Sequence, residues 1–290
     1  MLDVERAWTQ QALMKAAVAG LSEAGVPEAR RNVEWLLGAV LGCDRARLYA
    51  YPERSVPPEA VRRFDEMLVR RARREPLQYI LEEAHFFGLR LRVTPAVLIP
   101  RPETEQVVEA ALALLAGRPA PRVLDVGTGS GCIALALKHT RPDASVAACD
   151  VSRAALAVAR ENAARLGLEV AWLEADLLAP DFPGRVPGNL DLLVSNPPYV
   201  PPEEAPSLAP EVAAHEPHRA LFTGPDPLGF YRVLVRVAPV LVRPGGHVVF
   251  ETHAGYGAAV RDLLEAGGFE QARLQADLAG QPRIVSARRP

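Results

Sequence analysis

The stretch Val123-Leu124-Asp125-Val126-Gly127-Thr128-Gly129-Ser130-Gly131 decides how this chain folds. Its first half is mostly apolar and predicts a short buried strand, and the glycines that follow predict a turn before a helix that begins near Cys132. Glycine tolerates a positive φ and lets a ligand approach the backbone closely. A strand, a glycine-rich turn and a helix in this order are typical of nucleotide-like cofactor sites in α/β proteins.

Strand-like and helical segments alternate from residue 101 onward. This alternation predicts an α/β fold with a mainly parallel sheet that helices cover on both faces. The predicted strands are 122–126, 145–150, 169–176, 191–195 and 247–252, followed by a late pair at 269–275 and 283–287. The predicted helices are 103–116, 132–140, 152–166, 228–242 and 257–266. The Pro-rich stretch 197–227 predicts a long, partly ordered functional loop.

The residues before this part predict a different architecture. Apolar residues recur at helical spacing up to about residue 80, which predicts a group of helices. The alternation between residues 85 and 99, with a turn at Thr94-Pro95, predicts a β-hairpin. We therefore expect a helical domain over 1–80, a hairpin linker over 81–100 and the α/β domain over 101–290. A helix over 58–74 carries many arginines, which we interpret as a solvated face, with a docking surface for an acidic or RNA-like partner as the alternative.

The composition limits the classes of protein to consider. The 290 residues are 49% hydrophobic and carry a net charge of −2, which predicts a soluble globular protein and disfavours nonspecific nucleic-acid binding as its main activity. No apolar run of about 18 residues occurs and the first residues show no signal-peptide pattern, so no membrane association is expected. The cysteines, Cys43, Cys132 and Cys149, are scattered without metal-ligand spacing and indicate reduced thiols in the cytoplasm.

A second motif, Asn196-Pro197-Pro198-Tyr199, follows the apolar run 190–195. Neither proline can donate a ladder hydrogen bond, and each ring fixes φ near about −65°, so the strand should stop here. The Asn196 side-chain oxygen and the carbonyls of Asn196 and Pro197 would then stand at the strand's carboxyl edge, beside the flat ring of Tyr199. Acceptors next to an aromatic face suit a planar –NH2 group. A Pro-rich turn without a binding role is the alternative.

Acidic residues end the second and third predicted strands of the α/β part, at Asp150 and Asp176. At the carboxyl edge, Asp150 would accept hydrogen bonds from two ribose hydroxyls, and Asp176 or Leu177 would contact an adenine. The turn lacks the final glycine of dinucleotide enzymes, because Ile133-Ala134 occupies that position. Each aspartate alone could equally cap a helix or form a surface turn. Together with the glycine turn they predict a cofactor site that faces the –NH2 clamp, as group transfer requires.

This combination resembles the class I S-adenosylmethionine-dependent methyltransferases with an (Asn/Asp)-Pro-Pro-aromatic motif, which methylate exocyclic or amide nitrogen. Further stretches are similar to the peptide chain release factor glutamine methyltransferases, the HemK/PrmC family; they are 76–80, 85–88, 99–105, 216–221 and 280–289. The resemblance implies a Rossmann-like, mostly parallel sheet with an antiparallel last strand, after a small helical domain and a hairpin linker. It also implies S-adenosylmethionine as cofactor and N5-methylation of the glutamine in the Gly-Gly-Gln motif of release factors.

The resemblance assigns site residues as well. It implies cofactor contacts at Gly127, Thr128, Gly129, Ser130, Gly131, Asp150, Asp176, Leu177 and Asn196, and glutamine contacts at Asn196, Pro197, Pro198 and Tyr199. Among these, Asn196, Pro197 and Tyr199 would act in catalysis. No metal is expected, because His215 and His218 have no third ligand beside them, and no histidine–carboxylate pair indicates a general base. The stretch 251–255 is less glycine-rich than the family's pattern, which leaves its loop geometry open.

The expected partner is a peptide chain release factor, held by the N-terminal helices of a monomeric enzyme that requires no direct nucleic acid. Three alternatives stay open: methylation of another protein glutamine, such as one on a ribosomal protein, methylation of an exocyclic amine in DNA or RNA, and a non-catalytic cofactor-binding adaptor. Glu103 and Thr104 either contact substrate or cofactor or cap the helix that begins there.

Overall fold

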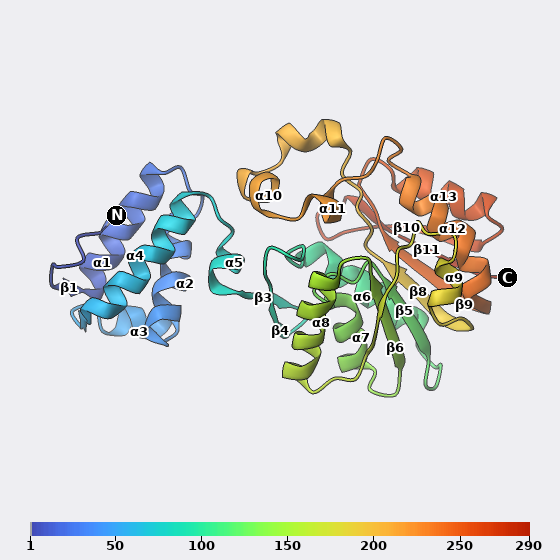
Figure 1. Cartoon of the computed structure of the whole chain (residues 1–290), viewed down its shortest axis with the longest axis horizontal. Coiled ribbons are helices and arrows are strands. Elements are labelled where there is room, and N and C mark those ends of the chain that lie inside the picture. Colours follow the sequence, from blue (N-terminus) through green and yellow to red (C-terminus); the bar gives the residue numbers. More distant parts are fainter. Residues whose placement is uncertain (1) are drawn as a thin grey trace. The chain divides into compact units, whose positions relative to one another are not determined.

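The computed structural model describes residues 2–290 and divides into two compact units (Figure 1). Unit 1 comprises the chain up to Glu82 together with Ala209–His215. Unit 2 comprises Glu83–Leu208 and Glu216–Pro290. The helical unit therefore includes a short segment from the middle of the Pro-rich stretch, which lies far along the chain from its other residues.

Unit 1 is a group of helices around an apolar core. The helices are α1 (Gln10–Glu23), α2 (Ala29–Leu41), α3 (Arg45–Ala50), α4 (Pro58–Ala72), α5 (Leu77–Leu81) and α10 (Pro210–His215), and a two-stranded ribbon joins β1 (Trp8–Thr9) to β2 (Ser55–Val56). The Thr9 side chain caps α1 by accepting the amide of Ala12. Leu13, Val33 and Phe64 are fully buried, so the apolar stripes of α1, α2 and α4 meet in one core.

Arg71 in α4 and Arg74, just after its end, show that the interpretation of a solvated arginine face is wrong in part. The Arg71 side chain is 5% exposed, and its Nη2 lies 2.8 Å from Oε1 of Glu211 in α10. The Arg74 guanidinium contacts the other oxygen of Glu211, also at 2.8 Å. Arg62 and Arg63 are exposed, as expected. The pairing was not readable from the sequence because Glu211 lies 140 positions after Arg71.

Unit 2 begins with a hairpin of β3 (Glu83–Phe86) and β4 (Leu89–Arg92). The expected turn at Thr94-Pro95 is present, with the Val97 amide donating to the Thr94 carbonyl at 3.0 Å, but it follows β4 and does not join two strands. The chain of the hairpin reverses not at Thr94-Pro95 but at Phe87-Gly88. Both turn residues have a positive φ, 49° and 77°, and two-residue turns of this kind match the right-handed twist of paired strands. The amide of Phe87 also donates a 2.7 Å hydrogen bond to Glu105, which holds the turn against the helix that follows.

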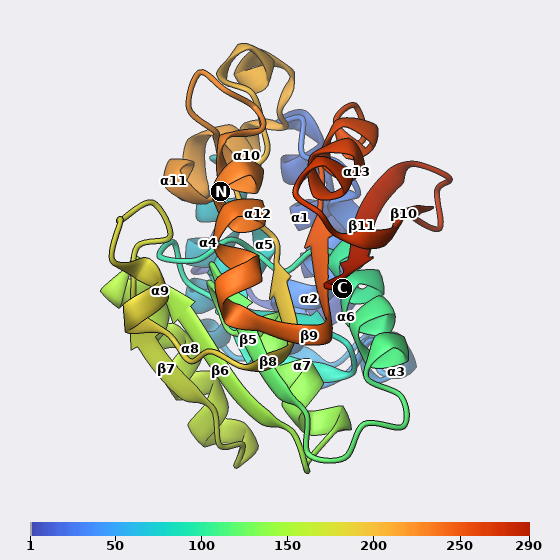
Figure 2. The same cartoon turned by 90° about the vertical axis from the view of Figure 1, so that its right-hand side faces the viewer.

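The rest of unit 2 contains a seven-stranded sheet in the order β10–β11–β9–β8–β5–β6–β7 (Figure 2). Its strands are β5 (Arg122–Val126), β6 (Ser145–Asp150), β7 (Ala171–Glu174), β8 (Leu190–Ser195), β9 (Val242–Glu251), β10 (Glu270–Ala276) and β11 (Pro282–Arg288). The strands β5 to β9 run parallel to one another, and β11 is antiparallel to both β9 and β10. A mostly parallel sheet with an antiparallel last strand is thus confirmed.

Helices cover both faces of this sheet (Figure 2). One face packs against α6 (Pro102–Leu114), α7 (Cys132–Thr140) and α8 (Arg153–Leu166), and the other against α9 (Phe182–Arg185), α12 (Gly229–Leu241) and α13 (Gly257–Ala266). Every residue of β8 is buried, as expected for a central strand covered on both sides. None of the helices within residues 2–290 is long and apolar enough to cross a bilayer.

The Pro-rich stretch after Tyr199 forms short helices rather than an irregular loop. It contains the 3₁₀-helix η1 (Pro202–Ser207), then α10, then α11 (His218–Leu221). Its base is closed, because the Val200 amide donates to the Leu221 carbonyl at 2.9 Å and the Thr223 amide donates to the Val200 carbonyl at 3.0 Å. The stretch therefore leaves and rejoins the sheet next to Tyr199.

Candidate active site

The predicted site residues follow four neighbouring strands of the sheet. Asn196 follows β8, Gly127 follows β5, Asp150 ends β6 and Asp176 comes shortly after β7. The register pairs Ser195 with Val126, Val126 with Cys149, and Asp150 with Glu174. All four groups therefore lie at the carboxyl edge of adjacent strands, which is where open α/β sheets bind ligands.

The glycine turn has two open positions and one closed position. Gly127, Gly129 and Gly131 have φ values of +74°, +56° and +83°. No atom lies within 4 Å of where a Cβ would stand on Gly127 or Gly129, whereas a Cβ on Gly131 would meet the Trp172 ring at 2.9 Å. The first two glycines thus leave room for a ligand at the backbone, and the third lets the Trp172 ring lie against the start of α7.

Asp150 fastens the glycine turn. Its Oδ2 accepts the amide of Gly129 at 2.9 Å, and its Oδ1 accepts the amide of Ser152 at 2.8 Å. Burial raises the pKa of Asp150. Because each carboxylate oxygen has two lone pairs, both oxygens can still accept a ligand hydroxyl.

Asp176 forms a surface turn, which was the alternative to a role in cofactor binding. The side chain is exposed and accepts the amide of Leu178 at 2.9 Å. The neighbouring Leu177 side chain is buried. If an adenine lies at this end of the sheet, Leu177 therefore offers the apolar contact and Asp176 stands at the surface.

Asp125 lies inside the opening stretch but was missed as a site residue. Its Oδ2 accepts the Thr128 hydroxyl at 2.6 Å, and its Oδ1 has no hydrogen-bond partner within residues 2–290. Burial raises the pKa of Asp125 to about 7. A fully buried acceptor without a donor fits a site that receives a ligand with N–H or O–H groups. An aspartate in the middle of a buried strand was the signal that could have found it.

A buried hydrogen-bond network holds the side chains of Asn196 and Tyr199 in the tetrapeptide. Nδ2 of Asn196 donates to Oγ1 of Thr104 at 3.2 Å, and the Thr104 hydroxyl donates to Oε2 of Glu251 at 2.7 Å. The Tyr199 hydroxyl donates to Oε1 of Glu251 at 3.1 Å. One carboxyl, 1% exposed at the end of β9, therefore connects to both ends of the motif.

Sequence reasoning missed Glu251 and left Thr104 undecided. The capping alternative for Thr104 is wrong, because its hydroxyl bonds to Glu251 and α6 begins without a side-chain cap. The signal for Glu251 was a glutamate at the end of the apolar run Val248–Phe250, at the same sheet edge as Asn196.

The acceptors of the motif that were expected to bind an –NH2 group have no partners in the described part of the chain. Oδ1 of Asn196 accepts no hydrogen bond there, and neither does the carbonyl of Pro197. The Tyr199 side chain is half-buried against the core of unit 2, and burial raises the pKa of its hydroxyl. The motif therefore has two acceptors without partners, the Asn196 Oδ1 and the carbonyl of the buried Pro197, beside a neutral aromatic ring.

Two further contacts hold the segments around the motif. Glu216 is buried, accepts the amide of Ile99 at 3.2 Å and pairs with Arg101 at 2.6 Å. These contacts join 99–105 to 216–221, two of the stretches that resemble the glutamine methyltransferase family. Nε2 of His253 lies 3.2 Å from Glu204 in η1. The His253 ring also lies 6.3 Å from the Tyr199 ring, so this histidine–carboxylate pair is next to the motif. The absence of a histidine general base stays a prediction. No cluster of three or more metal-ligating side chains occurs within residues 2–290.

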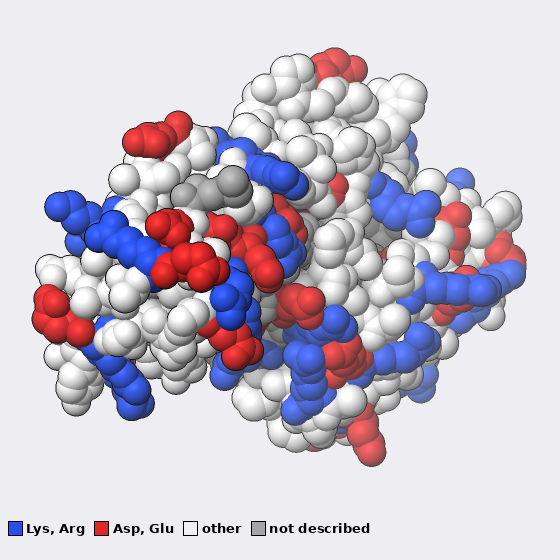
Figure 3. Space-filling model, turned by 60° about the vertical axis from the view of Figure 1, so that its left-hand side comes forward, with Lys and Arg blue, Asp and Glu red and all other residues white. Residues whose placement is uncertain are grey.

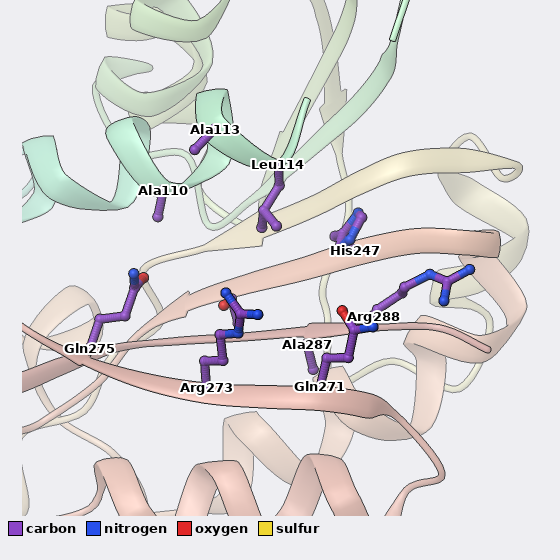
Figure 4. Close-up of a pocket in the computed structure, with 10 residues that line it drawn as sticks. Ala110, Ala113, Leu114, His247, Gln271, Arg273, Gln275, Ala287 and Arg288 are labelled. Carbon is purple, nitrogen blue, oxygen red and sulfur yellow. The ribbon is translucent and has the colours of Figure 1, made fainter. Parts of the chain in front are cut away.

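A hollow of about 160 Å³ lies elsewhere on unit 2, between α6 and the strands β9, β10 and β11 (Figure 4). His247, Arg273 and Arg288 line its floor, and Ala110 and Leu114 of α6 line its wall. The Arg273 side chain is exposed, so water already solvates it. The hollow contains none of the predicted site residues.

Comparisons with known proteins agree with this geometry. Residues 12–81 match the family model described as the PrmC N-terminal domain, and residues 106–221 match the model described as the methyltransferase small domain. The release factor glutamine methyltransferase of Cereibacter sphaeroides is 46% identical over 96% of this chain and 97% of its own length. The protein of the same name from Geobacter sulfurreducens is 41% identical over 99% of both chains.

A solved structure shows the same fold at low sequence identity. A T. thermophilus 16S rRNA methyltransferase, determined in complex with AdoMet and guanosine, aligns with a TM-score of 0.52 at 21% identity. The alignment covers 72% of this chain and 50% of that protein. This likeness concerns the fold of the sheet and its helices.

Proposed function

The chain belongs to the release factor glutamine methyltransferases, and on that premise we propose that it methylates the side-chain amide nitrogen of the glutamine in the Gly-Gly-Gln motif of peptide chain release factors. S-adenosylmethionine is the methyl donor. One observation carries the proposal furthest: Asn196 and Gly127 directly follow the paired residues Ser195 and Val126 of neighbouring parallel strands. An amide clamp and a cofactor turn therefore adjoin each other.

The residues around the glycine turn fit this cofactor. We propose that Gly127, Thr128, Gly129, Ser130 and Gly131 line its place, that Asp150 receives the ribose hydroxyls, that Asp176 and Leu177 border the adenine, and that Asn196 completes the site. The open space at Gly127 and Gly129 and the unpartnered Oδ1 of Asp125 support this assignment. When bound, S-adenosylmethionine supplies an electrophilic methyl group.

The tetrapeptide supplies the binding of the amide. An amide nitrogen is a poor nucleophile because its lone pair is delocalised into the carbonyl. We propose that Oδ1 of Asn196 and the carbonyl of Pro197 accept its two N–H bonds, while Pro198 and Tyr199 confine its plane. These hydrogen bonds favour the pyramidal nitrogen that develops during attack, so they strengthen in the transition state and raise the rate. Asn196 and Pro197 would hold the amide nitrogen toward the methyl group that bound S-adenosylmethionine would supply, with its thioether as the leaving group, and the methylated nitrogen would release a proton to water.

The experiment that tests the function uses labelled S-adenosylmethionine and four acceptors: a release factor, its Gln→Ala variant in the Gly-Gly-Gln motif, a ribosomal protein mixture and tRNA or DNA. We expect label in the intact release factor and none in the Gln→Ala variant. Equal label in both factors would refute the assigned glutamine. Label only in ribosomal proteins would identify another protein glutamine, and label only in nucleic acid would identify an exocyclic amine.

We further propose that the enzyme acts as a cytoplasmic monomer and requires no nucleic acid. In this proposal a domain over residues 1–80 docks the release factor, and residues 81–100 link this domain to the catalytic domain over 101–290. Three observations support these points. All three cysteines are free thiols, the net charge is −2, and acidic and basic side chains are interspersed on the face shown in Figure 3. Interspersed charge gives no extended cationic surface for a phosphate backbone. Analytical ultracentrifugation and release-factor pull-down with Arg62 and Arg63 variants would test the monomer and the docking role.

A further inference from the structure

The hydroxyl of Thr104 fixes the direction of the hydrogen bonds behind the tetrapeptide. A threonine hydroxyl has one proton to donate. Its oxygen lies 2.7 Å from Oε2 of Glu251 and 3.2 Å from Nδ2 of Asn196. Both oxygens of the Glu251 carboxyl accept a hydrogen bond, Oε2 from the Thr104 hydroxyl and Oε1 from the Tyr199 hydroxyl, which is the pattern of an ionised carboxylate, so the Thr104 proton is donated to Glu251. The hydroxyl is then left as an acceptor toward Asn196.

This direction determines which end of the Asn196 amide is open. An asparagine amide has an accepting oxygen at one end and a donating nitrogen at the other. Since Thr104 offers Asn196 only an acceptor, Nδ2 must face Thr104 and Oδ1 must face away. A flip of the amide would place Oδ1 against an oxygen that has no proton to share. Oδ1 has no other partner in the described residues, and thus it is free for a substrate.

The same carboxyl also holds the aromatic end of the motif. The Tyr199 hydroxyl donates to Oε1 of Glu251 at 3.1 Å, while Tyr231 donates to the Glu251 backbone carbonyl at 2.9 Å. Burial raises the pKa of Tyr199, so its hydroxyl remains a donor at neutral pH. Glu251 is thus fixed in its backbone and uses one side-chain oxygen for each end of the tetrapeptide.

We propose that Glu251 and Thr104 are positioning residues: ionised Glu251 acts through Thr104 to turn Oδ1 of Asn196 toward the reacting amide, and it holds Tyr199 beside that amide by its hydroxyl. The inference deepens the proposed function and rests on it. Neither residue touches the reacting atoms. Their contribution is to the orientation of the two side chains that do.

Protonation of Glu251 reverses the direction of the network. A protonated carboxyl can donate to Thr104, which can then donate to Oδ1 of Asn196 and hold the amide in the unproductive orientation. Burial raises the pKa of Glu251, and the negative charge of Glu103 adds to this. The hydrogen bonds from Thr104 and Tyr199 and the positive charge of Arg283 lower the same pKa. The net shift is upward, so turnover should fall as the pH falls toward this raised pKa.

The test compares four variants of the full-length enzyme. Thr104→Val removes the hydroxyl at nearly constant volume, Thr104→Ser restores it, and Glu251→Gln removes the ionisable group. Thr252→Val is the matched control. Thr252 is as buried as Thr104, with exposed fractions of 0% and 2%, and its hydroxyl bonds only to the Arg283 carbonyl, at 3.3 Å. For Thr104→Val we expect a fall in kcat of roughly 10²-fold, with S-adenosylmethionine affinity close to that of the wild type and a Tm lowered by a few degrees, because Glu251 loses one donor; Thr104→Ser should restore the Tm together with kcat.

Further results separate positioning from a structural role. Thr104→Ser should recover kcat to within about threefold of the wild type, Thr252→Val should keep it, and Glu251→Gln should lose the acidic limb of the pH profile of kcat. The side-chain amide resonances of Asn196, assigned by their absence in Asn196→Asp, should show one hydrogen-bonded proton in the wild type that Thr104→Val loses. This readout needs no substrate.

Unchanged kcat and unchanged Asn196 resonances in Thr104→Val would overturn the inference. A loss of kcat that Thr104→Ser fails to recover, together with a Tm that stays lowered, would overturn it too, because that pattern indicates a structural role alone. If the wild-type enzyme methylates no release factor, the proposed function fails, while the Asn196 resonances still decide whether the network sets the amide direction.

Discussion

The backbone amide of Gly129 donates a 2.9 Å hydrogen bond to the carboxylate of Asp150. The turn after β5 is thereby fastened to the end of the neighbouring strand β6, and the open backbone at Gly127 and Gly129 is held in place before any ligand arrives. A site that is ordered in advance loses less conformational freedom on binding.

Asp150→Ala should weaken S-adenosylmethionine binding by at least about tenfold, which corresponds to about 1.4 kcal/mol. The variant removes the acceptor of the Gly129 amide as well as the proposed acceptor for the ribose. Isothermal titration calorimetry measures the Kd. Asp143→Ala is the control, because that exposed carboxylate precedes β6 at the opposite edge of the sheet and bonds to the Ala120 amide and to Arg141; an equal loss in both variants would contradict the role given to Asp150.

Asn196→Ala should lower kcat by about 10²-fold to 10³-fold, as expected when a transition-state hydrogen-bond partner is removed. The Kd for S-adenosylmethionine should change far less, because Asn196 lies at only one border of the cofactor site. Single-turnover methylation of a release factor gives the rate, and calorimetry gives the Kd. Turnover at the wild-type rate would eliminate the clamp mechanism.

Gly131→Ala should destabilise the protein more than Gly129→Ala. Both glycines have a positive φ, +83° and +56°, so each alanine introduces backbone strain of about 1 kcal/mol. Only the Cβ at Gly131 would also meet neighbouring atoms, with Trp172 at 2.9 Å and Leu135 at 3.1 Å. We expect an additional loss of about 1–3 kcal/mol in the free energy of unfolding for Gly131→Ala. Urea unfolding measures both, and equal losses would show that the neighbours adjust freely.

Asp125 should make the free energy of unfolding depend on pH. Burial raises the pKa of its carboxyl to about 7 in the folded protein. A raised folded pKa gives a stabilisation that is fully present below the unfolded pKa of about 3.9 and is lost as the pH rises to the folded pKa. Between about pH 5.5 and 7 the loss reaches at most about 2 kcal/mol. Urea unfolding at several pH values measures it, and Asp125→Asn should lack this part of the dependence; parallel curves for the two proteins would contradict the assignment.

Glu211→Gln should destabilise unit 1, because it leaves Arg71, whose side chain is 5% exposed, without its charged partner. Breaking a buried pair in this way costs about 3 kcal/mol in the free energy of unfolding. Urea unfolding of the full-length protein measures the effect. Glu203→Gln serves as the control, since Glu203 is exposed on η1; a change of the same size in the control would remove the special role of Glu211.

The sequence allowed the sheet and much of its edge to be predicted for a physical reason. Buried parallel strands read as short apolar runs, and the residue that ends each run must lie at the same edge, so Gly127, Asp150 and Asn196 could be placed together. The helices α7 and α13 were predicted with the bounds that the structure shows, Cys132–Thr140 and Gly257–Ala266. Their glycine boundaries and apolar spacing are local signals.

The contacts that were missed join residues that are distant in the chain. Thr104 and Glu251 are 147 positions apart, and no local pattern links a threonine in the first turn of a helix to a glutamate at the end of a strand. The turn at Phe87-Gly88 was missed because a phenylalanine rarely adopts a positive φ. In each case, packing of the whole unit decided the outcome over local preference.

Because Ala209–His215 belongs to unit 1, it limits how genes for proteins of this kind can recombine. A gene fragment that ends at Glu82 encodes an incomplete helical unit, in which Arg71 and Arg74 lack the acid that neutralises them. Recombination that exchanges the two halves of such genes must therefore exchange a short internal coding segment as well. We expect chimaeras between distant relatives to express well only when both segments come from the same parent.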